Sequence, residues 1–457
     1  MKTYCKNLDL TDDAFIYEAV FDYLHDKVRK RSTVRFISGY TGYSESYVRQ
    51  TLIGEKREEG DGKDRFLKSV CTRISKEMSE HIRYRTVREH IMQRCYGEKV
   101  IRYLEITDVG SKKRRDLGLE ATIFRLYEAV ANEAALPLFR AKVGEYQIGS
   151  IKGKGQAYGR KAILRWMSRD PEGTKYGIQA DMSKCYPSIP HDKLQAMYHR
   201  DLHKSHDLLY LLDTFLSLYE EYPNPKALDP CKGILIGSPI SKDLCNYYVS
   251  RLYHYASEDL YVEKKRRGQV QRIRMLAHII IYADDILLFG QNKKLLQKSM
   301  DLIMKYAKDQ LGMTVKPDWV KFRTQYSREG GTISGRVIDF IGLQFHGGEI
   351  KEKYYFNRRT RYRRTRVTIR GRTFIKARRK LSRFTRMVKR RTVVTEKFAK
   401  SVISYYGCFT TTDSATFRKK NKVDQIMRIV RRIISDYAKG KAYDQTKYYN
   451  MWRSRIA

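Results

Sequence analysis

The spacing of apolar residues predicts an ordered series of helices and strands. Residues 1–95 carry apolar positions at mixed three- and four-residue intervals, which is typical of helices that bury one face. A polar interruption at residues 54–62 predicts a loop between them. Further on, strands are predicted at residues 100–107, 176–182, 278–289 (two strands joined by a tight turn) and 339–345, and helices at 120–140, 191–219, 239–258 and 293–311.

This order predicts an α+β lobe in which helices pack on a sheet. The composition changes after residue 350. Residues 351–400 contain 21 Lys and Arg against two acidic residues, a net charge of +19. We therefore expect three regions: a helical N-terminal extension at 1–95, an α+β region at 96–350 and a basic helical lobe at 351–457.

Within the N-terminal extension, residues 32–52 predict two short helices around Thr41-Gly42-Tyr43-Ser44. The pair resembles a helix-turn-helix. A plain helical hairpin explains the same pattern and is the favoured interpretation.

The charge of the chain indicates a polyanionic partner. Its 457 residues include 92 Lys and Arg against 51 Asp and Glu, which gives +41. With 42% hydrophobic residues the chain is not disordered, so nucleic acid is the expected partner. The 35 tyrosines are interpreted mostly as compositional bias rather than as base-stacking surface.

Localisation follows from what the sequence does not contain. No apolar stretch follows Met1 as in a signal peptide, and no segment is long and apolar enough to span a bilayer. The seven cysteines are scattered without a CxxC pair, which disfavours structural zinc and suits a reducing compartment. A cytoplasmic protein that does not bind membranes is expected.

The strongest chemical signal is Tyr282-Ala283-Asp284-Asp285 between apolar flanks. Two adjacent carboxylates in such a hairpin indicate neutralisation by cations, since desolvated like charges raise each other's pKa. The alternative, a solvated acidic turn, is disfavoured by the apolar flanks. Asp181 ends another predicted strand and could lie beside Asp284. Such oxygens suit Mg²⁺, and a pair of ions could activate a 3′-hydroxyl and stabilise leaving pyrophosphate.

In chain order, these segments resemble the motifs of reverse transcriptases. Tyr282-Ala283-Asp284-Asp285 resembles motif C, and Asp181 with Tyr186 resembles motif A. Three further segments fit the same series. They are Lys113-Arg114-Arg115-Asp116-Leu117 (fingers), Lys232-Gly233-Ile234-Leu235-Ile236-Gly237-Ser238-Pro239-Ile240-Ser241 followed by a helix with Asn246 (motif B) and Phe340-Ile341-Gly342-Leu343 (motif E, the primer grip). The resemblance implies a right-hand polymerase with fingers, a ferredoxin-like palm and a helical thumb.

The resemblance also implies roles for individual residues. Asp181, Asp284 and Asp285 would be the catalytic metal ligands, the Met182 carbonyl an additional ligand, and the cofactor two Mg²⁺ ions, with Mn²⁺ as an alternative. The implied dNTP-binding residues are Lys113, Arg115, Tyr186, Gly237 and Ser238. The implied template and primer contacts are Lys154, Gln156, Phe340, Gly342, Arg363 and Arg364, supported by aromatic residues such as Phe374 and Phe384 in the basic lobe.

Alternatives accompany two of these roles, and one motif departs from the family pattern. Tyr186, the implied steric gate against a 2′-hydroxyl, could be an ordinary core tyrosine, and Lys113 with Arg115 could belong to a solvated basic hairpin. In motif D, Trp319 stands where a lysine is expected, so Lys316 or Lys321 is the candidate proton donor for pyrophosphate.

The segment 147–156, the arginine-rich C-terminal lobe and Ser404-Tyr405-Tyr406-Gly407 resemble those of bacterial unknown-group, defence-associated reverse transcriptases, and they also resemble those of diversity-generating retroelements. The 107 residues after Ile350 suffice for a thumb but not for an added nuclease module. Gly237-Ser238-Pro239 keeps the ordinary motif B proline, which favours a defence role. The expected partners are an RNA template, in particular a dedicated non-coding RNA, a DNA product, dNTPs and a second copy or another protein. Protein-primed or untemplated synthesis and a non-catalytic RNA-binding scaffold are the other hypotheses.

Overall fold

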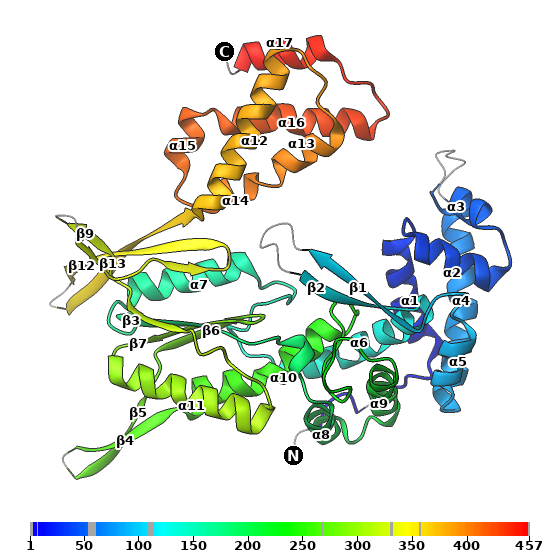
Figure 1. Cartoon of the computed structure of the whole chain (residues 1–457), viewed down its shortest axis with the longest axis horizontal. Helices are drawn as coiled ribbons and strands as arrows, with labels where there is room; N and C mark the ends of the chain where they lie inside the picture. The colour runs from blue at the N-terminus through cyan, green and yellow to red at the C-terminus, as the bar shows by residue number, and fades with distance from the viewer. Residues whose placement is uncertain are drawn as a thin grey trace. The chain divides into compact units, whose positions relative to one another are not determined.

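The computed structural model describes residues 3–6, 8–53, 61–107, 114–266, 268–329, 332–355 and 358–455. Helices begin and end the chain, a mixed region of helices and strands lies between them, and the chain divides into two compact units (Figure 1). Unit 1 comprises residues 1–151, 180–259 and 300–318, and unit 2 comprises 152–179, 260–299 and 319–457. Because the division passes through strand β3, the central sheet is described here as one continuous element.

The N-terminal part of unit 1 is helical, as predicted. Its helices bury apolar residues at helical spacing, for example Ile16, Val20 and Leu24 in the first of them. The predicted loop at 54–62 lies almost entirely outside the described residues. The helices are α1 (Asp13–Lys27), α2 (Arg31–Thr41), α3 (Glu45–Ile53), α4 (Asp61–Arg83) and α5 (Val87–Gln93).

The rest of unit 1, as far as the structure describes it, combines one hairpin with four α-helices and two short helical turns. The predicted strand at 100–107 is the first strand of this hairpin, whose two strands pair with Ile101 opposite Glu120. The strands are β1 (Ile101–Thr107) and β2 (Arg114–Glu120), and the helices are α6 (Thr122–Lys142), α8 (His191–Leu202), α9 (His206–Glu221) and α10 (Ser241–His254), with a 3₁₀ turn η1 (Tyr186–Ser188) and a π turn η2 (Tyr255–Asp259).

A four-stranded sheet carries the predicted motifs A and C. Its order is β6-β7-β3-β8, with β6 antiparallel to β7 and β3 antiparallel to β8. The strands are β3 (Tyr176–Asp181), β6 (His278–Tyr282), β7 (Asp285–Gly290) and β8 (Val320–Arg323), and α7 (Gln156–Arg169) and α11 (Lys293–Leu311) run alongside them (Figure 1). Helices separate β3 from β6 and β7 from β8, so this is the split βαβ arrangement expected of a ferredoxin-like sheet.

The pairing beyond this sheet differs from the predictions in two places. The single strand expected at 339–345 is two strands joined by a turn at Ile341 and Gly342, whose φ angles are +48° and +76°. The hairpin formed by β4 and β5 was not predicted. Every residue of β5 is exposed, so no buried apolar face indicated a strand there. The strands are β4 (Tyr261–Arg266), β5 (Gln269–Arg274), β9 (Ser327–Glu329), β10 (Thr332–Ser334), β11 (Ile338–Phe340), β12 (Leu343–Tyr355) and β13 (Arg358–Ile369).

The C-terminal lobe is helical and basic, but its helices begin at Gly371 rather than at residue 351. Residues before Gly371 belong to the long β12–β13 pair, because the chain there alternates between its two faces. The helices are α12 (Gly371–Lys389), α13 (Glu396–Ile403), α14 (Tyr406–Thr410), α15 (Ala415–Lys420), α16 (Val423–Ala438) and α17 (Gln445–Arg455).

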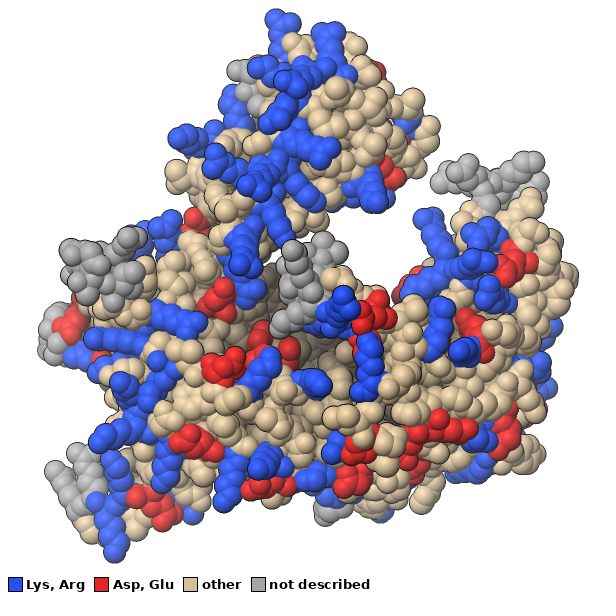
Figure 2. All heavy atoms as spheres, in the orientation of Figure 1, with Lys and Arg blue, Asp and Glu red and all other residues tan. Residues whose placement is uncertain are grey.

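The apolar and basic residues of this lobe are segregated. Phe384 is fully buried in its core and Phe374 packs against the same cluster, so these two aromatic side chains stabilise the lobe rather than offering stacking surface. Figure 2 shows Lys and Arg side chains gathered over α12 and neighbouring helices on the face it draws. In the described part of the chain, no helix is both long and apolar enough to cross a bilayer.

Candidate active site

The β6–β7 hairpin places two acidic residues at its tip. Tyr282 pairs with Asp285, which leaves Ala283 and Asp284 as the turn. Ala283 has φ +54°, a left-handed conformation that costs a non-glycine residue about 1 kcal/mol or more. Ile280 and Leu287 are buried on the strands, whereas Asp284 is exposed. The apolar flanks therefore fix the hairpin, and the carboxylate at its tip is presented to solvent rather than desolvated.

A third carboxylate reaches the same place from β3. Asp181 is the last residue of β3, and β3 neighbours β7 in the sheet. Ligand oxygens of Asp181, Asp284 and Asp285 all lie within 4.8 Å of one another. Asp181 is half-buried, and none of the three carboxylates is enclosed by the protein. The sequence-predicted acidic residues are thus brought together, as a cluster of like charge open to ligands.

Lys316 is the basic residue nearest to Asp181 among the candidates for motif D. Its backbone N–H donates to the Asp181 carbonyl (2.8 Å), and its ammonium contacts the Asp181 carboxylate. Lys321 instead donates to Gln297 Oε1 (2.8 Å). Of the two lysines left open by the sequence, the structure brings Lys316 to the acidic cluster.

The segment after Asp181 is joined to the predicted motif B by backbone hydrogen bonds. Ile234 N–H donates to the Tyr186 carbonyl (3.1 Å), and Gly233 N–H donates to the Ile189 carbonyl (2.9 Å). Gly233 has φ +100° and lies against Pro187, where a Cβ would come within 3.1 Å of a backbone oxygen. Tyr186 is half-buried at the start of η1. Motifs A and B are therefore held in a fixed register.

The other two implied motif B residues differ in their surroundings. Gly237 has φ +112°, a conformation that a side chain rarely adopts. Ser238 is buried near Glu128 and Tyr219. Burial and the neighbouring Glu120 raise the pKa of Glu128 well above its usual range, although the nearby Tyr219 and Ser238 hydroxyls oppose the shift. A buried carboxyl group whose pKa is raised, which the sequence did not indicate, therefore lies beside Ser238 of the motif B loop.

The predicted fingers residues lie on the β1–β2 hairpin or just outside the described part. Arg115 is exposed on β2, opposite Ile106. Lys113 lies outside the described residues. An exposed guanidinium on a hairpin is available to an anionic ligand.

The implied template and primer residues fall into two groups. Gln156, at the start of α7, donates from Nε2 to the Ile341 carbonyl (2.7 Å), and a Cβ on Gly342 would meet the same Nε2 at 3.3 Å. Gln156, which is exposed, thus holds the motif E turn by a hydrogen bond, Phe340 is buried next to the turn, and Lys154 lies in the loop that precedes α7.

Arg363 and Arg364, the two β13 arginines that were predicted to contact nucleic acid, lie in different environments. Arg363 is 2% exposed and donates to Thr324 Oγ1 (2.7 Å) and to the Pro171 carbonyl (3.2 Å). Burial lowers the pKa of its guanidinium. Arg364 is exposed. Because side chains alternate along a strand, only Arg364 of this pair faces solvent.

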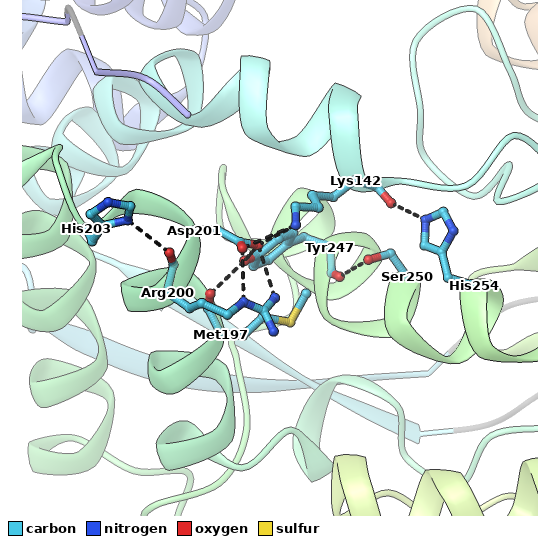
Figure 3. A network of polar contacts seen from close by, with 8 residues as sticks. All are labelled: Lys142, Met197, Arg200, Asp201, His203, Tyr247, Ser250 and His254. Carbon is cyan, nitrogen blue, oxygen red and sulfur yellow. Dashed lines mark hydrogen bonds and ion pairs between the residues drawn. The ribbon is translucent and has the colours of Figure 1, made fainter. Parts of the chain in front are cut away.

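A second cluster of charged residues in unit 1 was not indicated by the sequence. Figure 3 shows the side chains of Lys142, Arg200 and Tyr247 converging on the Asp201 carboxylate. Tyr247 Oη donates to Asp201 Oδ2 (2.8 Å), and Lys142 Nζ and Arg200 Nε each lie within 3.2 Å of a carboxylate oxygen. These partners come from three helices that are distant in sequence, so no local motif signals them.

Comparison with known families identifies the chain. The fold and its acidic cluster define a polymerase of the right-hand class. The family model for reverse transcriptase (RNA-dependent DNA polymerase) matches residues 106–345, more than half of the chain. The chain belongs to the reverse transcriptase family, and no curated protein matches it. It is therefore an RNA-directed DNA polymerase, a nucleotidyltransferase that uses an RNA template, dNTPs and divalent metal ions to make DNA.

Proposed function

We propose that this enzyme extends a primer by two-metal nucleotidyl transfer, with Mg²⁺ ions held by Asp181, Asp284 and Asp285. The observation that carries the proposal is the convergence of three solvent-accessible carboxylates within 4.8 Å. Hard carboxylate oxygens are the ligands that Mg²⁺ prefers together with substrate phosphates. When bound, such ions would activate the primer 3′-hydroxyl and offset the charge of the leaving pyrophosphate.

The surrounding residues support the rest of the reaction. The Lys316 ammonium contacts Asp181, so we infer that it stabilises the acidic cluster and delivers a proton to pyrophosphate. Arg115 supplies positive charge to the incoming triphosphate. Tyr186 excludes a 2′-hydroxyl, and the motif B backbone at Gly237 approaches the nascent base pair. Arg364 and the basic surface of the C-terminal lobe neutralise nucleic-acid phosphates.

The test is primer extension on an RNA template with dNTPs and Mg²⁺, comparing the wild type with Asp284→Asn. Asp284 is exposed, so its substitution leaves packing intact. Synthesis should fall by about a thousandfold or more, because a metal ligand is lost. Equal synthesis by the two proteins would refute the assignment and leave an RNA-binding scaffold.

For the biological role, we propose copying of a dedicated non-coding RNA in bacterial anti-phage defence. The proposal is supported by the resemblance of the segment 147–156 and of Ser404-Tyr405-Tyr406-Gly407 to the defence-associated group, and by Gly237-Ser238-Pro239, which keeps a proline that retroelement enzymes tend to lack. Sequencing the nucleic acid that copurifies with the protein tests the template, with one structured RNA expected. Phage plating on cells that carry the wild type or Asp284→Asn tests the role. Protection that survives the substitution, or a copied RNA from a variable gene, would exclude it in favour of a scaffold or a retroelement enzyme.

A further inference from the structure

Helices α2 and α3 form a tightly connected pair at the N-terminal end of the chain, beside α4 (Figure 1). Gly42, with φ +78°, ends α2, and its N–H donates to the Ser38 carbonyl (2.9 Å). Ser38 Oγ donates to the Tyr43 carbonyl (2.6 Å), and Ser44 Oγ accepts from Tyr47 N–H (3.2 Å) at the start of α3. A three-residue turn containing a left-handed glycine is the connection of a helix-turn-helix.

The buried apolar residues of the two helices lie on the faces that point into the protein. Val34 and Ile37 of α2 are fully buried, as are Val48 and Leu52 of α3 to within 2%. Arg35 of α2 also pairs with Glu45 of α3 (3.4 Å). These contacts fix α3 against α2, and the side of α3 that carries Arg49 and Gln50 is exposed.

That outward face carries side chains that can read a ligand. Tyr43 and Tyr47 remain 50% and 49% exposed, with ring centroids 4.8 Å apart. Arg49 and Gln50 are exposed on the same helix. Both rings also lie against Phe66 of α4 and are therefore only partly available to a ligand, whereas Arg49 and Gln50 are exposed.

The charge of the pair complements a polyanion. Between residues 27 and 53 there are six Lys and Arg and a single acidic residue, Glu45, which is already paired with Arg35. Lys30 and Arg31 are exposed where α2 begins, so their charges add to the positive end of the helix dipole. Phosphate groups are bound at helix starts of this kind.

We infer that α2 and α3 are a helix-turn-helix that binds double-stranded DNA, with α3 in the major groove. The major groove of B-DNA admits an α-helix, and the N-terminal residues of a recognition helix contact base edges there. The deep, narrow major groove of an RNA duplex does not admit one. Tyr47, Arg49 and Gln50 would contact bases, and Lys30 and Arg31 would contact the backbone. The site is separate from the polymerase carboxylates and assigns the enzyme a second, duplex-specific nucleic-acid contact.

The experiment selects binders from a random double-stranded DNA library with the full-length chain, in about 0.2 M salt to suppress charge-only binding. A short common sequence should be enriched. Arg49→Ala should weaken binding to that duplex by about 5- to 150-fold, the range of one bidentate base contact, and to a scrambled duplex by less than about threefold.

Lys76→Ala is the matched control. Lys76 is exposed on α4, so its substitution removes the same charge without touching α3. It should change binding to both duplexes by less than about threefold. Primer extension by Arg49→Ala should equal that of the wild type, which separates this test from the test of the polymerase. The inference is overturned if no sequence is enriched, if Arg49→Ala and Lys76→Ala act alike, or if an RNA duplex competes as well as the selected DNA.

Discussion

The acidic cluster of the proposed active site and the Asp201 cluster differ in how their negative charges are balanced by neighbouring groups. At the active site, three carboxylates converge and Lys316 contacts one of them. At Asp201, one carboxylate with a side chain 2% exposed receives donors from Lys142, Arg200 and Tyr247. Asp201 therefore has three donors from the protein for one carboxylate, whereas the proposed active site brings three carboxylates together. This difference is the one expected between a structural acidic group and a site for cations.

The buried Glu128 differs from Asp201 in the direction of its pKa shift. Burial pushes the pKa of Asp201 up, but donors from Arg200, Tyr247 and Lys142 outweigh burial and lower it. The pKa of Glu128 is raised instead, by burial and by the neighbouring Glu120. By linkage, the stability contributed by Asp201 is present above its unfolded pKa and lost as pH falls. The stability contributed by Glu128 is complete below its unfolded pKa, about 4.3, and is lost as pH rises.

Asp181→Asn is the strongest test of the acidic cluster, because it removes one of the three carboxylate charges. Primer extension should fall by about a thousandfold or more, equivalent to about 4 kcal/mol, because one ligand of the bound ions is lost. The free energy of unfolding should change by less than about 1 kcal/mol, since the cluster is open to solvent. Asp309→Asn, at an exposed position on α11, is the control and should keep full activity. A large loss of stability in Asp181→Asn would show that the cluster is structural.

Asp201→Ala tests the Asp201 cluster, in which one carboxylate is contacted by three donor side chains. Removing a buried carboxylate leaves Lys142, Arg200 and Tyr247 without their common acceptor, so the free energy of unfolding should fall by about 3 kcal/mol. Chemical denaturation measures this loss. The kcat of the folded fraction should stay within about twofold of the wild type. A catalytic defect larger than the loss of folded protein would erase the distinction between the two clusters.

Lys316→Ala tests whether the contact with Asp181 is catalytic. The rate of a single turnover should fall by about a hundredfold, the scale of a lost proton donor. Lys321→Ala is the matched control, because Lys321 donates to Gln297, and its rate should change by less than about twofold. The pH profile of Lys316→Ala should also lose its alkaline limb. If Lys321→Ala is the slower variant, the proton-donor assignment moves to Lys321.

Glu128→Gln sharpens the contrast between a proton and an ion pair. The amide is neutral at every pH, so its unfolding free energy should not decline with rising pH as that of the wild type does. The difference in slope is limited to one proton, at most about 1.4 kcal/mol per pH unit. Denaturation midpoints measured between pH 5 and pH 9 check this, with Asp309→Asn expected to follow the wild type. Parallel curves for Glu128→Gln and wild type would mean that Glu128 is ionised in the folded protein.

The sequence predicted those parts of the molecule in which local pattern and tertiary environment agree. The β6–β7 hairpin was predictable because its apolar strands are buried and its acidic tip is not. The β4–β5 hairpin was missed because its second strand buries nothing. The basic stretch around Arg363 was expected in a helical lobe and lies in β13, since partner strand β12 decides its conformation.

The same reasoning explains the site residues. Asp181 and Asp284 were paired correctly because each ends or joins an apolar strand, a purely local signal. Arg363 was expected at the nucleic acid, yet its guanidinium is enclosed by Thr324 and the Pro171 carbonyl. Those partners lie 39 and 192 residues away, and only the folded chain reveals them.

The left-handed turn at Ala283 also limits how this polymerase can be altered by directed evolution. A library at position 283 should retain glycine, asparagine and alanine, which accept φ +54°, and lose valine, isoleucine and threonine, whose branched Cβ does not. The set of amino acids tolerated at position 283 is therefore limited by backbone geometry, whatever nucleotide chemistry the library is selected for.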